Sequence, residues 1–414
     1  MISTNNKLRG GYYTPKVISE FLAKWAIRNF NDRVLEPSCG DGNILVECCK
    51  VLQNFGAPVS KIQQSLTGVE YYDGEAQKSR NRLQELGLFE SSKNVQSGDF
   101  FKFCVRQLHQ KPAYDVVIGN PPFIRYQDFP DEQKLVAIEL MRKKGLRTNR
   151  LTNSWLAFLA CSTMLLNKDG RLAMVIPAEL FQVNYASQLL KYLSDFFKRI
   201  FIITFKKLVF HEVQQEVVLL LAERNATNIE GIKVIELNDA SDLIDLRVKQ
   251  IRRSDLKPID HTTDKWTKYF LEKDEILFLK QIINNPQVKL TGELYEVDVG
   301  VVTGQNAFFV LNQQEMDTFN LREYTHKIVT RSNHLTGLVF SDQDFRGNVE
   351  KNFPSFLFYP ESKKHSDLPA SVQKYVELGV KRDIHLGFKC RSRKCWFKVP
   401  SIWIPDAFML RQVH

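Results

Sequence analysis

The stretch that decides the fold is YDVVIGNPPF, at residues 114–123. Its first six residues form a short apolar run of β-branched type, which is typical of a buried strand of a parallel sheet. Pro121 and Pro122 then end the strand, because proline has no N–H group to donate to a sheet. The stretch therefore presents the Asn120 amide, a stiff turn and the Phe123 ring at the carboxyl end of a strand. In open α/β sheets, ligands bind at that edge.

The turn at residues 120–123 can recognise an amine. The Asn120 side-chain oxygen and the Pro121 carbonyl are neighbouring hydrogen-bond acceptors, which suits one planar –NH2 group. Phe123 can stack on the ring that carries such an amine. An exocyclic amine is a poor nucleophile because its lone pair is delocalised into the ring. Two acceptors that take hydrogen bonds from both N–H groups would free that lone pair. Asn120, Pro121, Pro122 and Phe123 are therefore candidate catalytic residues, although the same tetrapeptide also fits a structural Pro-Pro turn.

A glycine turn follows an earlier predicted strand, within RVLEPSCGDGN at residues 33–43. Gly40 and Gly42 allow backbone N–H groups to come close to a ligand. The segment has neither the GxGxxG pattern of dinucleotide sites nor the lysine of a phosphate-binding loop. It carries Glu36 and Asp41 instead, and carboxylates suit a ligand with a cationic end. An ordinary turn is the alternative interpretation.

Two more carboxylates close predicted strands further along the chain. Glu70 ends the strand at residues 66–70 and can accept hydrogen bonds from ribose hydroxyls. Asp99 ends the strand at residues 95–100 and can accept a hydrogen bond from an adenine amine, with helix capping as the alternative role. The glycine turn, Glu70, Asp99 and Asn120 thus follow successive strands in the order that a Rossmann-like half-sheet supplies them.

The composition narrows the class of protein. The chain has 414 residues, 43% of them hydrophobic, and a net charge of +10. This length predicts two or three domains, and the positive charge favours a polyanionic partner. Seven scattered cysteines without a CxxC pair indicate neither a disulfide framework nor a metal site. No apolar stretch is long enough to span a bilayer, so we expect a cytoplasmic protein with no membrane partner.

The chain divides near residue 262, where the apolar periodicity restarts after a charged segment, so we expect domains at 1–262 and 263–414. Residues 124–150 are polar and basic, and we expect a loop there that covers the substrate, contacts a phosphate or lies in solvent. KCRSRKCWFK, at residues 389–398, combines basic residues that neutralise phosphates with aromatic residues that stack. The last residues still have the character of a domain interior, so we expect a truncated C-terminal domain.

Together these motifs resemble a known family, the gamma-class amino-specific DNA methyltransferases of the Taq/Eco57I type, which are N6-adenine methyltransferases of restriction–modification systems. The resemblance rests on four matches to the family's cofactor and catalytic motifs: YYTP at residues 12–15, LEPSCGDG at 35–42, GDF at 98–100 and NPPF at 120–123. Weaker matches extend it over nearly the whole chain, at residues 154–158, 170–177, 210, 300–309 and 391–400.

The resemblance implies an α/β fold. It implies a Rossmann-like class I methyltransferase domain, with a mostly parallel seven-stranded sheet flanked by helices, followed by a smaller α+β target-recognition domain. It also implies S-adenosyl-L-methionine as cofactor and methyl transfer to N6 of an adenine flipped out of double-stranded DNA. Phe123 and Phe210 would then contact the flipped base.

The family's motifs assign the cofactor contacts by position. Glu70 would hold the ribose and Asp99 the adenine amine, while Thr14, Glu36 and the loop around Gly40 would hold the methionine end. The full set of expected cofactor-binding residues is Tyr13, Thr14, Glu36, Ser38, Gly40, Gly42, Glu70, Tyr71, Asp99, Phe100, Asn120 and Phe158.

The resemblance also implies partners and leaves alternatives open. We expect a monomer on DNA, and a cognate restriction endonuclease is a further expected partner. One alternative is a methyltransferase acting on RNA or on a protein glutamine, since the same tetrapeptide suits any planar amine or amide. Another is a non-catalytic DNA-binding subunit of a defence complex.

Overall fold

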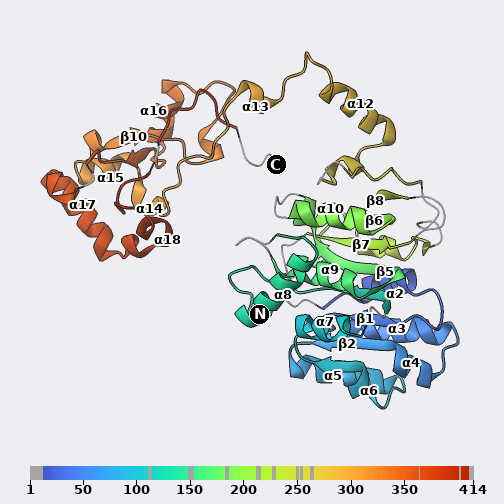
Figure 1. Ribbon diagram of the computed structural model, residues 1–414. Coiled ribbons are helices and arrows are strands. Elements are labelled where there is room, and N and C mark those ends of the chain that lie inside the picture. Colours follow the sequence, from blue (N-terminus) through green and yellow to red (C-terminus); the bar gives the residue numbers. More distant parts are fainter. Residues whose placement is uncertain are drawn as a thin grey trace. The chain divides into compact units, whose positions relative to one another are not determined.

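The computed structural model describes residues 13–409, except residues 111–113, 148–152, 182–185, 211–215, 226–229, 249–250, 252–254, 262–264, 363 and 401. The chain forms two compact units, Met1–Asn285 and Pro286–His414 (Figure 1). The domain boundary that the sequence places after residue 262 remains a prediction. No helix of the described residues combines the length and apolar character that crossing a membrane requires.

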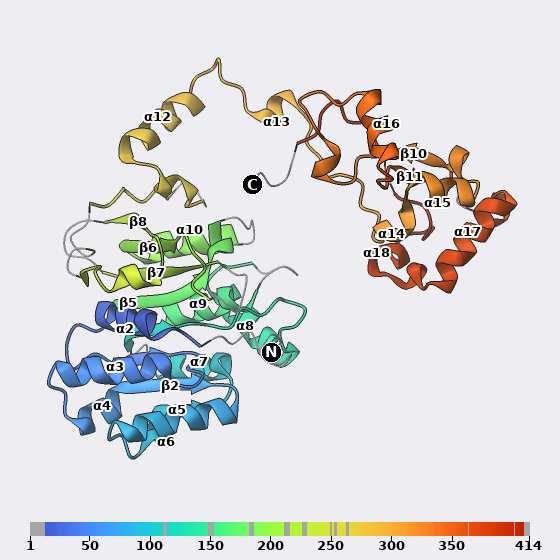
Figure 2. The ribbon, with the colours of Figure 1, turned by 180° about the vertical axis from the view of Figure 1, so that it is seen from behind.

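The first unit is built on one eight-stranded sheet with the strand order β3-β2-β1-β4-β5-β7-β6-β8 (Figure 2). The strands are β1 Val34–Glu36, β2 Leu66–Glu70, β3 Val95–Ser97, β4 Tyr114–Gly119, β5 Leu166–Pro177, β6 Arg199–Phe205, β7 Val217–Glu223 and β8 Gly231–Leu237. All neighbours pair in parallel except β7, which runs antiparallel to both β5 and β6. The predicted mostly parallel sheet is therefore confirmed.

The expected number of seven strands is wrong, because β8 pairs in parallel with β6 as an eighth. Its sequence GIKVIEL places two charged residues among apolar ones within a charged segment, and most of its side chains are only partly buried. An edge strand of this kind lacks the continuous apolar run of the central strands, so it gives a weaker sequence signal.

Helices cover both faces of the sheet. The helices of this unit are α2 Lys16–Ala26, α3 Asn43–Asn54, α4 Val59–Ser65, α5 Asp73–Glu85, α6 Ser91–Asn94, α7 Phe100–Leu108, α8 Asp131–Lys143, α9 Ser154–Met164, α10 Ser187–Phe196 and α12 Lys273–Ile283. Val117 in β4 packs into the core cluster that holds α7 to α10, whereas Val116 and Ile118 pack into the cluster with α2 and α3. This split follows from the pleat, which turns successive side chains to opposite faces.

The expectation of a loop over residues 124–150 is wrong for its central part, where α8 forms. Acidic residues in its first turn and basic residues in its last turn complement the helix dipole. Its buried side chains, Ala137, Leu140 and Met141, recur at helical spacing and pack into the core. The sequence did not reveal this helix because its apolar residues form only a narrow stripe in a mostly polar segment. Residues 148–150 lie outside the described residues.

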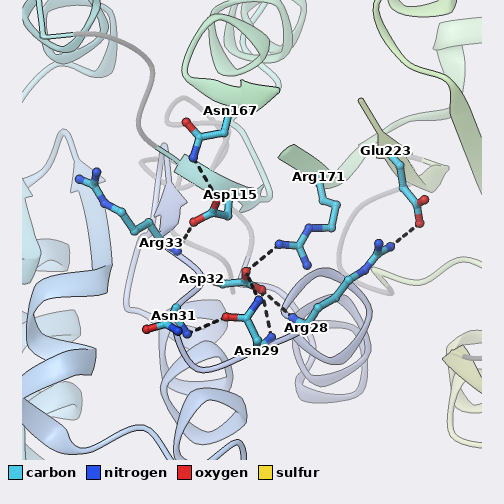
Figure 3. A network of polar contacts seen from close by, with 9 residues as sticks. All are labelled: Arg28, Asn29, Asn31, Asp32, Arg33, Asp115, Asn167, Arg171 and Glu223. Atoms are coloured by element: carbon cyan, nitrogen blue, oxygen red, sulfur yellow. Dashed lines mark hydrogen bonds and ion pairs between the residues drawn. The ribbon is translucent and has the colours of Figure 1, made fainter. Parts of the chain in front are cut away.

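A polar network lies at the amino edge of the sheet, around the buried pair of Asp32 and Arg171 (Figure 3). The Arg171 guanidinium of β5 donates to Asp32 Oδ1 at 2.8 Å, and both side chains are at most 7% exposed. Asp32 also accepts from the backbone N–H of Arg28 at 2.6 Å, and Arg28 pairs with Glu223 of β7. The turn between α2 and β1 is therefore tied to β5 and β7 through charge-assisted hydrogen bonds.

The second unit is a small α+β domain with the three-stranded antiparallel sheet β10-β11-β9. Its elements are β9 Val310–Leu311, β10 Thr325–Lys327, β11 Phe356–Phe358, and the helices α13 Thr291–Leu294, α14 Asn306–Phe309, α15 Gln313–Thr318, α16 Asp342–Glu350, α17 Ala370–Lys381 and α18 Phe388–Arg391. Phe308 stacks on Tyr375 in its core, with ring centroids 4.7 Å apart. The segment at residues 300–304 leads into α14, where the Gln305 carbonyl accepts from the backbone N–H groups of Phe308 and Phe309.

Candidate active site

A pocket opens at the carboxyl ends of β1, β2, β3 and β4, where an open α/β sheet is expected to bind its ligand. All the predicted cofactor residues line this pocket except Gly42 and Asp99. The lining residues are Tyr13, Thr14, Glu36, Pro37, Ser38, Cys39, Gly40, Asp41, Asn43, Ile44, Glu70, Tyr71, Tyr72, Glu75, Gly98, Phe100, Asn120, Pro122, Ile124, Pro130, Gln133 and Phe158. Residues that are far apart in the sequence are thus gathered as the motif order predicts.

Glu70 fixes the glycine loop against the second strand. Its Oε2 accepts from Gly40 N at 2.8 Å and its Oε1 accepts from Tyr72 N at 2.9 Å. Burial raises the pKa of Glu70, and these two backbone N–H groups oppose that rise. A carboxylate has about four lone-pair sites, so ribose hydroxyls can still bind beside the two backbone donors.

Gly42 shapes the loop from outside the pocket. It directly precedes α3 and has φ of +89°. Residues other than glycine rarely adopt this left-handed backbone conformation. A Cβ atom there would lie 2.5 Å from Ser79 Oγ and 3.0 Å from Ser79 Cα, both in α5. Gly42 therefore serves the turn and the close approach of α5, and its contact with a ligand stays a prediction.

Replacing Gly42 with alanine is expected to lower the free energy of unfolding by about 2–3 kcal/mol, from left-handed strain plus overpacking against Ser79. Chemical denaturation measures this loss. Gly56→Ala is the matched control, since Gly56 has φ of +85° but a Cβ atom added there would meet nothing within 4 Å. Equal losses for the two variants would show that the contact with Ser79 contributes nothing.

The two acidic residues of the glycine loop differ in their partners. Asp41 pairs with Arg82, whose Nη1 lies 2.8 Å from Asp41 Oδ2 and 2.7 Å from Asn43 Oδ1. Glu36 is 2% exposed, and its Oε2 has no hydrogen-bond partner among the described residues. Burial raises the pKa of Glu36 well above the ordinary value, and the charges of Asp41 and Glu70 add to the rise. A cationic ligand group beside Glu36 would relieve that burial cost.

Asp99 caps α7. Its Oδ1 accepts from Phe101 N at 2.6 Å and from Lys102 N at 3.1 Å, which is the capping role that the sequence left open. Its neighbours Gly98 and Phe100 line the pocket. The contact of Asp99 with an adenine amine stays a prediction.

Aromatic rings form part of the pocket wall. Phe100 stacks on Phe158 of α9 with ring centroids 5.1 Å apart and planes 12° apart, and both rings are buried. Tyr71 and Tyr72 meet edge to face after β2, 5.2 Å apart. Such surfaces suit a planar, aromatic ligand group.

Sequence reasoning missed several lining residues, among them Tyr72, Ile124, Pro130 and Gln133. Pro130 and Gln133 belong to the segment interpreted as a loop, and they reach the pocket because α8 begins there. Tyr72 directly follows Tyr71, and its aromatic character was the available signal.

The side chain of Asn120 is oriented by the N-terminal segment. The side-chain Nδ2 of Asn120 donates to Thr14 Oγ1 at 3.2 Å. Ser38 Oγ donates to the backbone carbonyl of Asn120 at 3.4 Å. Because Nδ2 of the Asn120 side chain faces Thr14, its Oδ1 points away from Thr14. Tyr12, which begins the YYTP motif, lies outside the described residues.

Phe123 is partly buried and packs against both core clusters of the first unit. Phe210, at the end of the described part of the β6–β7 connection, is 9% exposed and belongs to the second of these clusters. Residues 211–215 lie outside the described residues. The stacking of a base on Phe123 and Phe210 stays a prediction.

Comparison with known sequences decides the family. Residues 1–291 match the profile of the N-6 DNA Methylase family, which covers well over half of the chain. The chain belongs to the N-6 DNA methylase family. The predicted resemblance is thereby confirmed. Residues 263–414 match a second profile, the C-terminal domain of Type II methyltransferase M.Eco57I.

Individual relatives of this chain are distant. It is 23% identical to Type II methyltransferase M.AccI of Acinetobacter calcoaceticus, over 95% of this chain and 70% of the relative. It is 24% identical to Type II methyltransferase M.HindII of Haemophilus influenzae, over 80% of this chain and 60% of the relative. The chain thus spans only part of the length of either protein.

A solved structure shares the fold. This is a nuclease-deletion mutant of the Type ISP restriction-modification enzyme LlaGI, in complex with a DNA substrate mimic. The TM-score is 0.54 at 14% identity, over 75% of this chain and 36% of the other. At this identity the similarity shows the fold alone.

Proposed function

We propose that the chain is a site-specific DNA methyltransferase that transfers a methyl group from S-adenosyl-L-methionine to N6 of a flipped-out adenine in double-stranded DNA, within a restriction–modification or phage-defence system. One observation carries the proposal: the Asn120-Pro121-Pro122-Phe123 turn borders the pocket that contains the buried carboxyl group of Glu36, whose Oε2 has no partner among the described residues. Membership of the N-6 DNA methylase family supports it.

The pocket fits the proposed cofactor. S-adenosyl-L-methionine supplies an electrophilic methyl group on a cationic sulfur and also carries a cationic amino group. Glu36 would face a cationic part of the molecule, and Glu70 would accept from the ribose hydroxyls. Phe100 and Phe158 would contact the adenine ring.

The catalytic turn would make the target amine nucleophilic. Asn120 Oδ1 and the Pro121 carbonyl would accept hydrogen bonds from the two N6 protons, which would leave the N6 lone pair available to the methyl group that the cofactor supplies. The new nitrogen–carbon bond would replace the carbon–sulfur bond of the donor. One N6 proton then leaves to solvent, and no strong base is required. Phe123 and Phe210 would hold the flipped base, since stacking of a base on an aromatic side chain contributes about 1–3 kcal/mol.

The second unit would bind DNA, in keeping with proposed domains at residues 1–262 and 263–414. Lys389, Arg391 and Lys394 are all exposed and therefore accessible to phosphates. Arg393 has another role, because its Nη2 donates to the carbonyls of Val302 and Thr303 at 2.8 and 2.7 Å. We further propose that the protein acts in the cytoplasm as a monomer on DNA, with a cognate restriction endonuclease as partner.

Cofactor affinity is expected to depend on pH through Glu36. Its raised pKa keeps it protonated to higher pH than an ordinary carboxyl group, and a bound cation favours the carboxylate. Affinity should therefore rise as pH increases from the ordinary carboxyl range, at roughly pH 4–5, and level off above the raised pKa. The folding stability of the cofactor-free protein changes in the opposite direction. It falls as pH rises over the same range, because Glu36 holds its proton more tightly in the folded than in the unfolded chain.

Titration calorimetry from roughly pH 5 to 8 measures this dependence. Glu36→Gln is expected to remove it and to weaken cofactor binding at the upper pH by roughly tenfold, the equivalent of one pKa unit. Glu47→Gln is the matched control, because Glu47 is also buried but pairs with Lys50 in α3, outside the pocket. An unchanged pH dependence in Glu36→Gln would contradict the assignment.

The proposed reaction is tested by incubating the protein with S-adenosyl-L-methionine and unmethylated genomic DNA, followed by mass spectrometry of the nucleosides. N6-methyladenine is the expected product, and sequencing of the same DNA identifies the methylated site. Parallel reactions with RNA and with protein substrates provide the comparison. Methylation confined to those substrates, or cofactor binding without methylation of any substrate, would overturn the proposal.

A further inference from the structure

One buried serine holds the catalytic turn on both sides of Phe123. Ser154, the first residue of α9, donates through Oγ to the Pro122 carbonyl at 2.5 Å. The same Oγ accepts from Ile124 N at 2.9 Å. The backbone N–H of Ser154 donates to the Ile124 carbonyl, also at 2.9 Å. Three hydrogen bonds thus connect this one residue to the two neighbours of Phe123.

Ser154 is itself held firmly in place. The residues on either side of it, Asn153 and Trp155, both donate to Oε1 of Glu179, at 2.7 and 3.0 Å. Glu179 belongs to the 3₁₀ helix η1, Ala178–Phe181, which follows β5 directly. The start of α9 is therefore fixed to the end of the central strand β5, and the catalytic turn is fixed to α9.

This arrangement bears on the geometry of the proposed reaction. The two prolines restrict the backbone φ of residues 121 and 122 but leave their ψ angles to be set by contacts. Ser154 supplies those contacts at Pro122, the residue after the Pro121 carbonyl that would accept from the target amine. Phe158 lies one helical turn after Ser154 on α9 and lines the cofactor pocket. One helix therefore sets the positions of both the turn and part of the cofactor wall.

We propose that Ser154 is a positioning residue for methyl transfer, acting through the Pro122 carbonyl and the Ile124 N–H to align the Asn120–Pro121 acceptors and the Phe123 ring with the methyl donor. This inference rests on the proposed function. Misplacement of reacting groups by about 1 Å can cost on the order of 10²-fold in rate, so a loosened turn affects the chemical step more than binding.

The test compares Ser154→Ala with Ser162→Ala in the full chain. Ser162 lies on the same helix and is equally buried, and its Oγ has no hydrogen-bond partner among the described residues. Single-turnover methylation at saturating DNA and cofactor gives the rate of the chemical step. Calorimetry gives the cofactor Kd, and hydrogen exchange measured by mass spectrometry gives the protection of the Ile124 amide.

Ser154→Ala is expected to lower the single-turnover rate by roughly 30- to 100-fold and to speed exchange at Ile124, with cofactor Kd within about threefold of wild type. Ser162→Ala should match wild type in all three measurements. Equal rates for the two alanine variants would overturn the proposal. So would faster exchange at Ile124 without a slower chemical step, since Ser154 would then be only structural.

Ser154→Thr and Ser154→Val form a second pair, which decides the question if the alanine variant does not fold. Threonine and valine have nearly the same shape and differ in the hydroxyl group, so Ser154→Thr is expected to react faster than Ser154→Val by at least about tenfold. Equal rates would overturn the proposal.

A wild-type protein that methylates nothing would overturn the proposed function and the role of Ser154 in positioning together. Exchange at Ile124 would then still show whether Ser154 holds the turn.

Discussion

Replacing Asn120 with alanine is expected to slow methyl transfer by on the order of 10²–10³-fold or more, while the cofactor Kd changes by less than about threefold. The side chain would lose the acceptor that binds the target amine, whereas Glu36, Glu70 and the aromatic wall would remain to hold the cofactor. The chemical step is measured by single-turnover methylation and the cofactor Kd by calorimetry. A change confined to the rate indicates an interaction made mainly in the transition state.

Two further variants sharpen this result. Asn81→Ala removes an exposed asparagine of α5, whose side chain bonds only Gln77 among the described hydrogen bonds, and should behave as wild type. Asn120→Gln keeps the amide but moves it by one methylene, so it should also be slow if position matters. Loss of cofactor binding in Asn120→Ala would mean that Asn120 holds the cofactor rather than the amine, which would contradict its assignment.

Replacing Asp32 with alanine is expected to lower the free energy of unfolding by about 3–5 kcal/mol, the largest loss of stability among the predicted effects. The buried Arg171 guanidinium would keep its charge without its carboxylate partner (Figure 3). The backbone N–H groups of Arg28 and Asn29 would also lose their acceptor. Urea denaturation followed by circular dichroism measures the loss.

A double-mutant cycle isolates the ion pair. Two other nitrogens of Arg171, Nε and Nη1, have no partner among the described residues, so Arg171→Leu should cost less than Asp32→Ala. The double variant should then be more stable than Asp32→Ala alone, because no unpaired charge stays buried. Glu20→Ala, which breaks an exposed pair with Lys24, should change stability by at most about 1 kcal/mol. Additive losses in the cycle would show that Asp32 and Arg171 do not interact.

The sequence predicts the parts of the site that follow directly from strand ends. Glu36, Glu70 and Asn120 each come at or just after a strand that pairs in parallel with its neighbour, so their convergence follows from strand order alone. The aromatic residues Phe100 and Phe158 were placed through the family motifs, and both line the pocket.

The parts that the sequence does not predict depend on contacts between distant segments. Arg82 neutralises Asp41 across 41 positions, and Ser154 reaches Pro122 across 32, and no local pattern marks either pair. The eighth strand and α8 were missed for another reason, since each has a half-exposed or narrow apolar face within charged sequence. A sequence motif does not decide the role of Asp99, because the same carboxylate can cap a helix and can also bind a ligand.

All the described residues that line the pocket lie between Tyr13 and Phe158, before the first residue of β5. The later strands β5 to β8 complete the sheet and the core, but none of their described residues lines this pocket. Substitutions in the described parts of the connections after β6 and β7 are therefore expected to change cofactor binding little, whereas Glu179 after β5 acts on the pocket through α9. The fold is modular in this sense, because strands β1 to β4 carry the pocket and the other half of the sheet supports them.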